Sequence, residues 1–304
     1  MAFVALGQGS GGKTASPTKA SNVAFILLAP GMIYLGLFFL TPLVSLVITS
    51  LKTASITGEI GMYDYAFQIS NYGYAVGQYW PQISRSFIYA VTATILALII
   101  SYPIAYFIGV KARNKPLLKA LLLTLVIAPF FISFLLRTFA WKQIFANEAP
   151  ATQFIQALGL LPAGEYIIGS DIAVIAGLTY NFIPFMTLPI YTSLERLDVR
   201  LVEAGADLYA TPRKTFFQVT FPLSLPGVIS GTLLTFIPIS GDYVSASRDF
   251  LGGSDTAMIG NVVEANFFRI QDYPTASALS VLLMAVIVIL VSVYVRKSGT
   301  EELL

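Results

Sequence analysis

The sequence predicts an all-α membrane protein with six transmembrane helices. The first observation is composition: of 304 residues, 56% are hydrophobic and only 11% are charged, whereas soluble domains average about 25% charged residues. The second is that uncharged residues gather in six windows of about the length a helix needs to cross a hydrocarbon core, roughly 20 residues. A protein of this size cannot hide so much apolar surface from water, so the bilayer is the expected solvent.

The six predicted spans are Ser21–Leu51, Ser86–Val110, Ala120–Leu136, Ile172–Leu194, Thr215–Gly241 and Tyr273–Val295. The third is the shortest, and it reaches Trp141 if the Arg137 side chain extends to the interface or pairs with an outer acid. The first is too long for a cleavable signal peptide. Residues 1–20 are rich in Gly, Ser, Thr and Lys, so we expect a disordered cytoplasmic tail there, and a second short tail at 298–304.

Basic residues predict the orientation, because cytoplasmic segments carry an excess of Lys and Arg. With the N-terminus inside, inner segments hold 12 basic residues and outer segments hold 6. The inner set is Lys13, Lys19, Lys111, Arg113, Lys115, Lys119, Arg196, Arg200, Arg213, Lys214, Arg296 and Lys297, and the outer set is Lys52, Arg85, Arg137, Lys142, Arg248 and Arg269. We therefore expect a multi-pass protein of the bacterial plasma membrane with both termini in the cytoplasm.

Several function classes are disfavoured by what the sequence lacks. There is no cysteine and no histidine, which removes thiolate and imidazole metal sites and every triad with a histidine base. No basic run is interleaved with aromatic residues as a nucleic-acid groove requires. A membrane-embedded enzyme would need convergent acids or a nucleophile in the spans, and a channel or secondary carrier would show inverted repeats and intramembrane charges. Neither pattern is visible, and we expect no metal and no cofactor in this chain.

A polar island separates the fourth and fifth spans. Leu194–Asp207 has the spacing of a short amphipathic helix. Thr211 followed by Pro212 predicts the N-cap and first residue of a second helix, which the prolines at 222 and 226 should end. Two readings stay open: an amphipathic loop that lies on the lipid headgroups, or a knob that fills a socket on a soluble partner.

This island resembles the coupling motif of ABC importer permeases, which is EAA, three residues, G, nine residues, I, any residue, LP. Glu203 and Ala204 match its first two positions, Gly205 replaces the second alanine, and Tyr209 stands where the family has glycine. A left-handed turn without glycine costs about 1 kcal/mol or more. The turn is therefore either strained at Tyr209 or made differently, with the next two residues as the breaker. The resemblance implies that the ATPase-coupling residues are Glu203, Ala204, Gly205, Asp207, Tyr209, Thr211 and Pro212.

Four further segments look like the permease subunits of polyamine (spermidine/putrescine) importers. They are SYPIAYFI at 101–108, VIAPFFISFLLRTFAW at 126–141, IPFMTLPIYTSLERLD at 183–198 and GDYVSASRDFLGGSDTAMIGNVVEANFF at 241–268. The last run, with Gly252-Gly253 and Ile259-Gly260-Asn261, narrows the resemblance to the polyamine branch. That branch lies close to permeases for ferric iron and other small solutes, which are the alternative.

The resemblance also implies an architecture and partners. It predicts an importer-permease fold in which residues 21–297 form the transmembrane domain and residues 195–225 form its cytoplasmic coupling helices. The expected partners are a second homologous permease, a cytosolic ATPase dimer that holds ATP and Mg, and an extracytoplasmic substrate-binding protein. This chain is expected to be non-catalytic, and it has no G-x-x-x-x-G-K-[ST] phosphate loop.

The solute path is predicted from breaks and polar groups in the spans. The fifth span, with Pro226, Gly227, Gly231 and Pro238, is expected to be the most breakable. Asp242 and Tyr243 offer the carboxylate and aromatic face that an ammonium ligand prefers, although Asp242 is equally well read as a solvated helix end. Tyr180 and Asn181 offer polar groups in mid-span, for which hydrogen bonding between helices is the simpler reading. Asp249 and Glu264 are expected to be plain loop acids.

Overall fold

The computed structural model describes residues 22–55, 59–159 and 166–297. The predicted tails at 1–20 and 298–304 lie outside these ranges. The chain divides into two compact units, one ending at Leu46 and the other beginning at Val47, and each is described by itself.

The first unit is a single apolar helical run. It consists of α1 (Asn22–Leu35), a π-helical turn η1 (Gly36–Leu40) and the beginning of α2 (Thr41–Ser50). Its large side chains from Phe25 to Leu40 are exposed on every side of the helix. A helix that is apolar all round is suited to lipid rather than water, and its bounds confirm the first predicted span.

The second unit begins with a small hairpin and a long helix. Strands β1 (Thr53–Ala54) and β2 (Tyr63–Asp64) pair antiparallel, with Thr53 opposite Asp64. Helix α3 (Ser70–Tyr106) runs on through η2 (Phe107–Lys111). The expected start at Ser86 was wrong, because a polar helical stretch with a kink at Tyr79 precedes the apolar part. Residues 70–85 include polar and charged side chains, so they fall outside the uncharged window from which the span was predicted.

The third predicted span is broken rather than straight. Helix α4 (Pro116–Ile127) and the 3-10 turn η3 (Ala128–Phe131) are followed by α5 (Phe134–Ile144), and the two halves meet at 97°. Ile132, which directly follows η3, has an extended backbone at the break, and Pro129 lies within η3. Among the described residues, no acid forms an ion pair with the Arg137 side chain on α5. The side chain is buried and its Nη1 donates to the Asn181 carbonyl oxygen at 3.4 Å.

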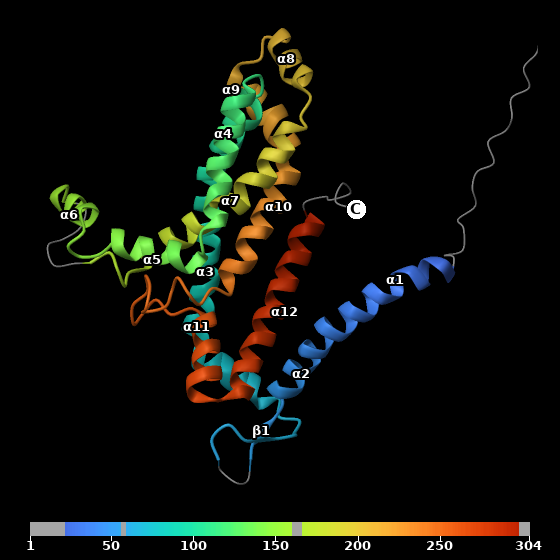
Figure 1. Ribbon diagram of the computed structural model, residues 1–304, viewed down its shortest axis with the longest axis vertical. Helices are drawn as coiled ribbons and strands as arrows, with labels where there is room; N and C mark the ends of the chain where they lie inside the picture. The colour runs from blue at the N-terminus through green and yellow to red at the C-terminus, as the bar shows by residue number, and fades with distance from the viewer. Residues whose placement is uncertain (1–21, 56–58, 160–165, 298–304) are drawn as a thin grey trace, which may run out of the picture. The chain divides into compact units, whose positions relative to one another are not determined.

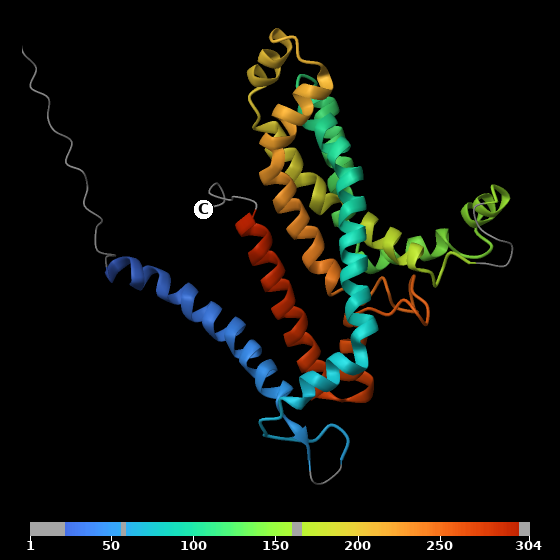
Figure 2. The ribbon, with the colours of Figure 1, turned by 180° about the vertical axis from the view of Figure 1, so that it is seen from behind.

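Three helices form the centre of the second unit. Helix α7 (Asp171–Glu195) packs against both α3 and α10 (Phe221–Ser240), as Figures 1 and 2 show. The remaining elements are α6 (Pro150–Ala157), α8 (Val199–Asp207), α9 (Pro212–Thr215), η4 (Phe216–Thr220), α11 (Ile259–Glu264), η5 (Ala265–Ile270) and α12 (Tyr273–Lys297). Helices α8 and α9 lie at one end of this unit, and α11 lies at the other (Figure 1).

The fifth span is continuous, so the expectation that it would be the most breakable was wrong. Helix α10 contains Pro226 and Pro238 without interruption. Its glycines serve close packing instead. A Cβ at Gly227 would lie 2.6 Å from the Pro189 carbonyl oxygen and 2.6 Å from the Ser193 Cβ on α7. The absence of a side chain therefore lets two central helices touch backbone to backbone.

The helical membrane fold is confirmed. Within the described residues, five helices are long and apolar enough to cross a membrane, and the bent α4–α5 pair makes a sixth candidate.

Candidate coupling segment and substrate path

The polar island forms a helix–turn–helix at one end of the second unit. Leu194 is fully buried in α7 and α8 begins only at Val199, so the expected single helix from Leu194 to Asp207 is interrupted. The Asp198 carboxylate accepts a hydrogen bond from Arg200 N at 3.0 Å and caps the new helix. Leu194 and Leu197 are buried, whereas Leu201 and Ala204 are exposed, so the predicted apolar face does not continue across Asp198.

The second helix starts where the sequence predicts. The Thr211 hydroxyl accepts from Lys214 N at 3.3 Å, and Pro212 is the first helical residue. The prolines at 222 and 226 do not end it, because α9 continues through η4 into α10. Pro222 is the second residue of α10, which directly follows the π-helical turn η4, and Pro226 lies inside α10. A proline inside a membrane helix is tolerated where neighbouring groups satisfy the backbone carbonyl that it frees.

Tyr209 makes the turn between the two helices in the left-handed conformation, with φ of 57°. Ala210 N donates to Gly205 O at 3.0 Å, which closes the turn around it. The backbone is therefore left-handed at Tyr209 itself, as the first of the two alternatives predicts. The Tyr209 ring is 97% exposed and Leu208 is 80% exposed.

The exposed tip collects several of the predicted coupling residues. Glu203, Asp207 and Tyr209 all lie on the surface of the second unit. Gly205 faces inward, and a Cβ there would lie 3.0 Å from the Thr215 side chain of α9. The helix pair is therefore closely packed inside and presents acidic and aromatic groups outside. Their role in coupling stays a prediction.

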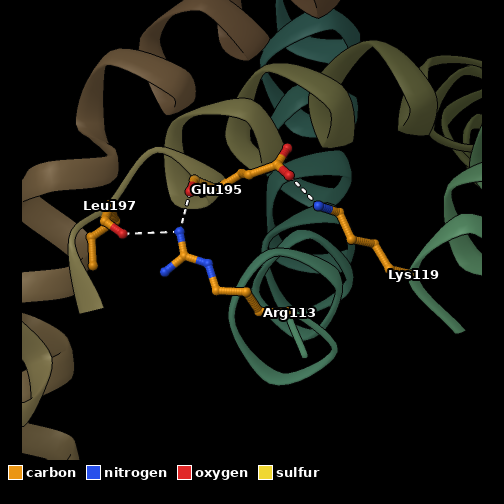
Figure 3. Close-up of polar contacts among 4 residues, drawn as sticks. All are labelled: Arg113, Lys119, Glu195 and Leu197. Carbon is orange, nitrogen blue, oxygen red and sulfur yellow. Dashed lines mark hydrogen bonds and ion pairs between the residues drawn. The ribbon is translucent and has the colours of Figure 1, made fainter. Parts of the chain in front are cut away.

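A cluster of charged groups fixes the end of α7 just before α8. Figure 3 shows Arg113 reaching the carbonyl oxygens of Glu195 and Leu197, the second at 3.0 Å, while Lys119 pairs with the Glu195 carboxylate. Cationic groups stabilise the free carbonyls at a helix C-terminus. These contacts join residues about eighty positions apart, so no local sequence pattern signals them. Through these contacts, the residues at and just before the start of α4 hold the end of α7 and the segment that leads into α8.

Asp242 lies two residues after Ser240, the last residue of α10. Only 8% of it is exposed, and its carboxylate accepts hydrogen bonds from Ser245 N at 2.7 Å and Ser245 Oγ at 3.5 Å. Burial raises the pKa of Asp242 to about 6. The carboxylate thus caps its own loop. Its place in the substrate path stays a prediction.

Tyr243 follows with its ring outward, 54% exposed. Its carbonyl oxygen accepts from Asn261 Nδ2 at 2.6 Å, and a Cβ at Gly260 would lie 2.6 Å from the Asp242 carbonyl oxygen. The start of α11 is therefore pressed against this backbone and holds it in place. Two residues of the motif Ile259-Gly260-Asn261 therefore have a structural role: Gly260 allows the close approach, and Asn261 makes the hydrogen bond.

Tyr180 and Asn181 lie where α7 meets α5. Asn181 Nδ2 donates to Thr138 Oγ1 at 3.0 Å, and its buried Oδ1 has no hydrogen-bond partner among the residues that the structure describes. The Tyr180 ring packs against Trp141 with centroids 5.1 Å apart. This geometry favours the reading of hydrogen bonding between helices, and a role in the path stays a prediction.

Comparison with known proteins places this geometry in a family. Residues 101–297 match the family described as binding-protein-dependent transport system inner membrane component. The chain belongs to this family. It is therefore a transport component of the inner membrane and has the permease fold.

Three similar proteins illustrate the match. The chain is 33% identical over 279 residues to the spermidine/putrescine transport system permease protein PotB of Haemophilus influenzae, covering 91% of this chain and 96% of that protein. It is 34% identical over 267 residues to PotB of Escherichia coli K12, covering 87% and 94%. A bacterial alginate ABC transporter, solved with an alginate pentasaccharide-bound periplasmic protein, superposes with a TM-score of 0.66 at 14% identity, covering 91% and 94%. At that identity the solved structure supports the fold alone.

Proposed function

We propose that this chain is a membrane-spanning permease subunit of an ATP-driven importer of polyamines, spermidine or putrescine. The observation that carries the proposal is the identity of about one third, over nearly the whole chain, to permeases named for these two solutes. The run at 241–268, which resembles the polyamine branch, agrees with this identity.

The partners follow from the proposed role. A cytosolic ATPase dimer supplies the hydrolysis with ATP and Mg, an extracytoplasmic binding protein delivers the solute, and a second homologous permease completes the pore. The chain itself is the non-catalytic translocating subunit. The exposed tip at Glu203–Tyr209 supports a soluble partner at the α8 end, and the excess of basic residues there favours the cytoplasm for that end and for both termini.

Glu203 is the residue proposed to pair with the ATPase. It lies exposed on α8, where a carboxylate can meet a basic group of a socket in a charge-assisted hydrogen bond. Glu203→Lys reverses this charge without touching the interior. We expect the variant to fold and insert normally while solute uptake falls about tenfold or more, since such bonds contribute roughly 1.5–3 kcal/mol.

The experiment is uptake of labelled spermidine, putrescine and ferric iron by cells that lack this chain, complemented with wild type or Glu203→Lys. The proposal expects wild type to restore polyamine uptake and the variant to restore little. Asp198→Asn, which alters a cap rather than the tip, is the matched control and should transport normally. Restoration of iron uptake alone would assign the chain to the alternative solute. Full activity of Glu203→Lys would remove Glu203 from coupling.

A further inference from the structure

A groove of about 540 Å³ opens between α10, α11 with η5, and α12; Figure 1 shows these helices. Its size lies within the usual range for small-molecule sites, about 300–1,000 Å³. Apolar side chains such as Val263, Leu283 and Met284 form its wall, and the rings of Tyr243 and Phe267 join them. Among the described residues that line it, Glu264 carries the one charged side chain.

The Glu264 carboxylate is weakly held, and its side chain also lines a neighbouring hollow together with Arg269. Its side chain is 29% exposed, and its partner is Arg269 Nε at 3.8 Å, on a side chain that is 70% exposed. An ion pair that is long and open to water holds its carboxylate weakly. Asp242 differs in this respect, because its oxygens already accept hydrogen bonds from Ser245.

Tyr243 and Glu264 both line the groove, and the segments that carry them are in contact. Gly260 presses α11 against the Asp242 backbone, and Asn261 fixes the Tyr243 carbonyl. Residues four apart share a face of a helix, so Glu264 follows Gly260 on the face that meets this segment. The expectation that Glu264 is a plain loop acid was wrong, because Glu264 is the last residue of α11 and lines this groove.

We propose that this groove binds one ammonium end of a linear polyamine, with Glu264 as its counter-ion and the Tyr243 and Phe267 rings as cation–π partners. An alkyl ammonium needs a carboxylate or aromatic faces for its charge and apolar contact for its methylene chain. The groove offers a carboxylate at Glu264 for the charge, and apolar contact along Val263, Leu283 and Met284 for the methylene chain. The inference rests on the proposed function and names the subsite that the solute meets in this chain.

The test uses the complete transporter with its ATPase, second permease and binding protein in proteoliposomes. A photoreactive aryl-azide spermine analogue reports occupancy, and labelled spermidine taken up per ATP hydrolysed reports retention. We expect Glu264→Gln to lower both about tenfold, as for loss of one charge-assisted hydrogen bond. Glu264→Asp should recover part of the loss. Asp249→Asn is the matched control, since Asp249 is an exposed acid on the preceding loop outside this groove.

The outcomes separate this inference from the proposed function. Wild-type spermidine uptake with no change in Glu264→Gln would overturn the subsite and leave the function standing. Equal photolabelling of wild type and Glu264→Gln would also overturn it, because the groove would then hold the apolar part of the probe as it would hold a lipid chain. A wild-type complex that imports a different solute and no polyamine would overturn both.

Discussion

Tyr209 is a non-glycine residue in the left-handed region, and its replacement by glycine measures the strain in the turn. A left-handed L-residue costs roughly 1–2 kcal/mol from its Cβ. Glycine removes that cost but adds about 0.5–1 kcal/mol of chain entropy in the unfolded state. The ring is 97% exposed, so its loss costs this chain little. We therefore expect Tyr209→Gly to be neutral or to stabilise the chain by about 1 kcal/mol.

Tyr209→Ala is the matched control, because it removes the ring and keeps the Cβ. The glycine variant should unfold about 2 °C above the alanine variant, since 1 kcal/mol moves the Tm of a chain of this size by roughly 2–4 °C. Thermal unfolding of the purified chain in detergent measures this. An alanine variant that unfolds above the glycine variant would refute the strain, because only the entropy cost of glycine would then remain. Binding of the ATPase reports on the ring separately: equal losses in both variants would assign the ring to that interface.

Two further predictions concern the interior. Burial raises the pKa of Asp242 from 3.8 to about 6, so between these values the folded state holds a proton that the unfolded state has released, and stability falls as pH rises through that window. Asp242→Asn should abolish this fall in unfolding temperature, and an unchanged pH profile would contradict the assignment. Gly227→Ala places a Cβ 2.6 Å from the Pro189 carbonyl oxygen and should cost about 1–3 kcal/mol, whereas Gly73→Ala, which meets nothing within 4 Å, should be neutral or stabilising. Similar unfolding temperatures for the two variants would mean that α7 and α10 do not meet at Gly227.

The spans were predictable because their physical signal is local. Uncharged windows located the first, fourth, fifth and sixth predicted spans, and the Thr211-Pro212 pair located the start of α9. The break at Ile132 was not predictable in the same way. Proline occurs in several spans, and whether the chain bends there depends on the neighbours that satisfy the freed backbone groups. Pro226 lies inside a continuous helix while Pro129 lies in the turn before the 97° bend.

The candidate site was predictable only in part for a related reason. The position of Tyr209 in a left-handed turn followed from the motif register. The bracing of α7 by Arg113 and Lys119 joins distant segments and leaves no local pattern. The environment of Asp242 was not predictable either. The sequence indicates a carboxylate beside an aromatic residue, and only the folded loop shows that this carboxylate already accepts a hydrogen bond from Ser245 N.

ATP-dependent accumulation of labelled spermidine in proteoliposomes tests the central claim most directly. The vesicles hold this chain with its second permease, ATPase and binding protein, and a set of vesicles without this chain is the control. The account predicts polyamine accumulation that requires both ATP and this chain, and that unlabelled putrescine or spermidine competes away. Accumulation that persists without this chain, or transport of another solute with no effect of polyamines, would contradict it.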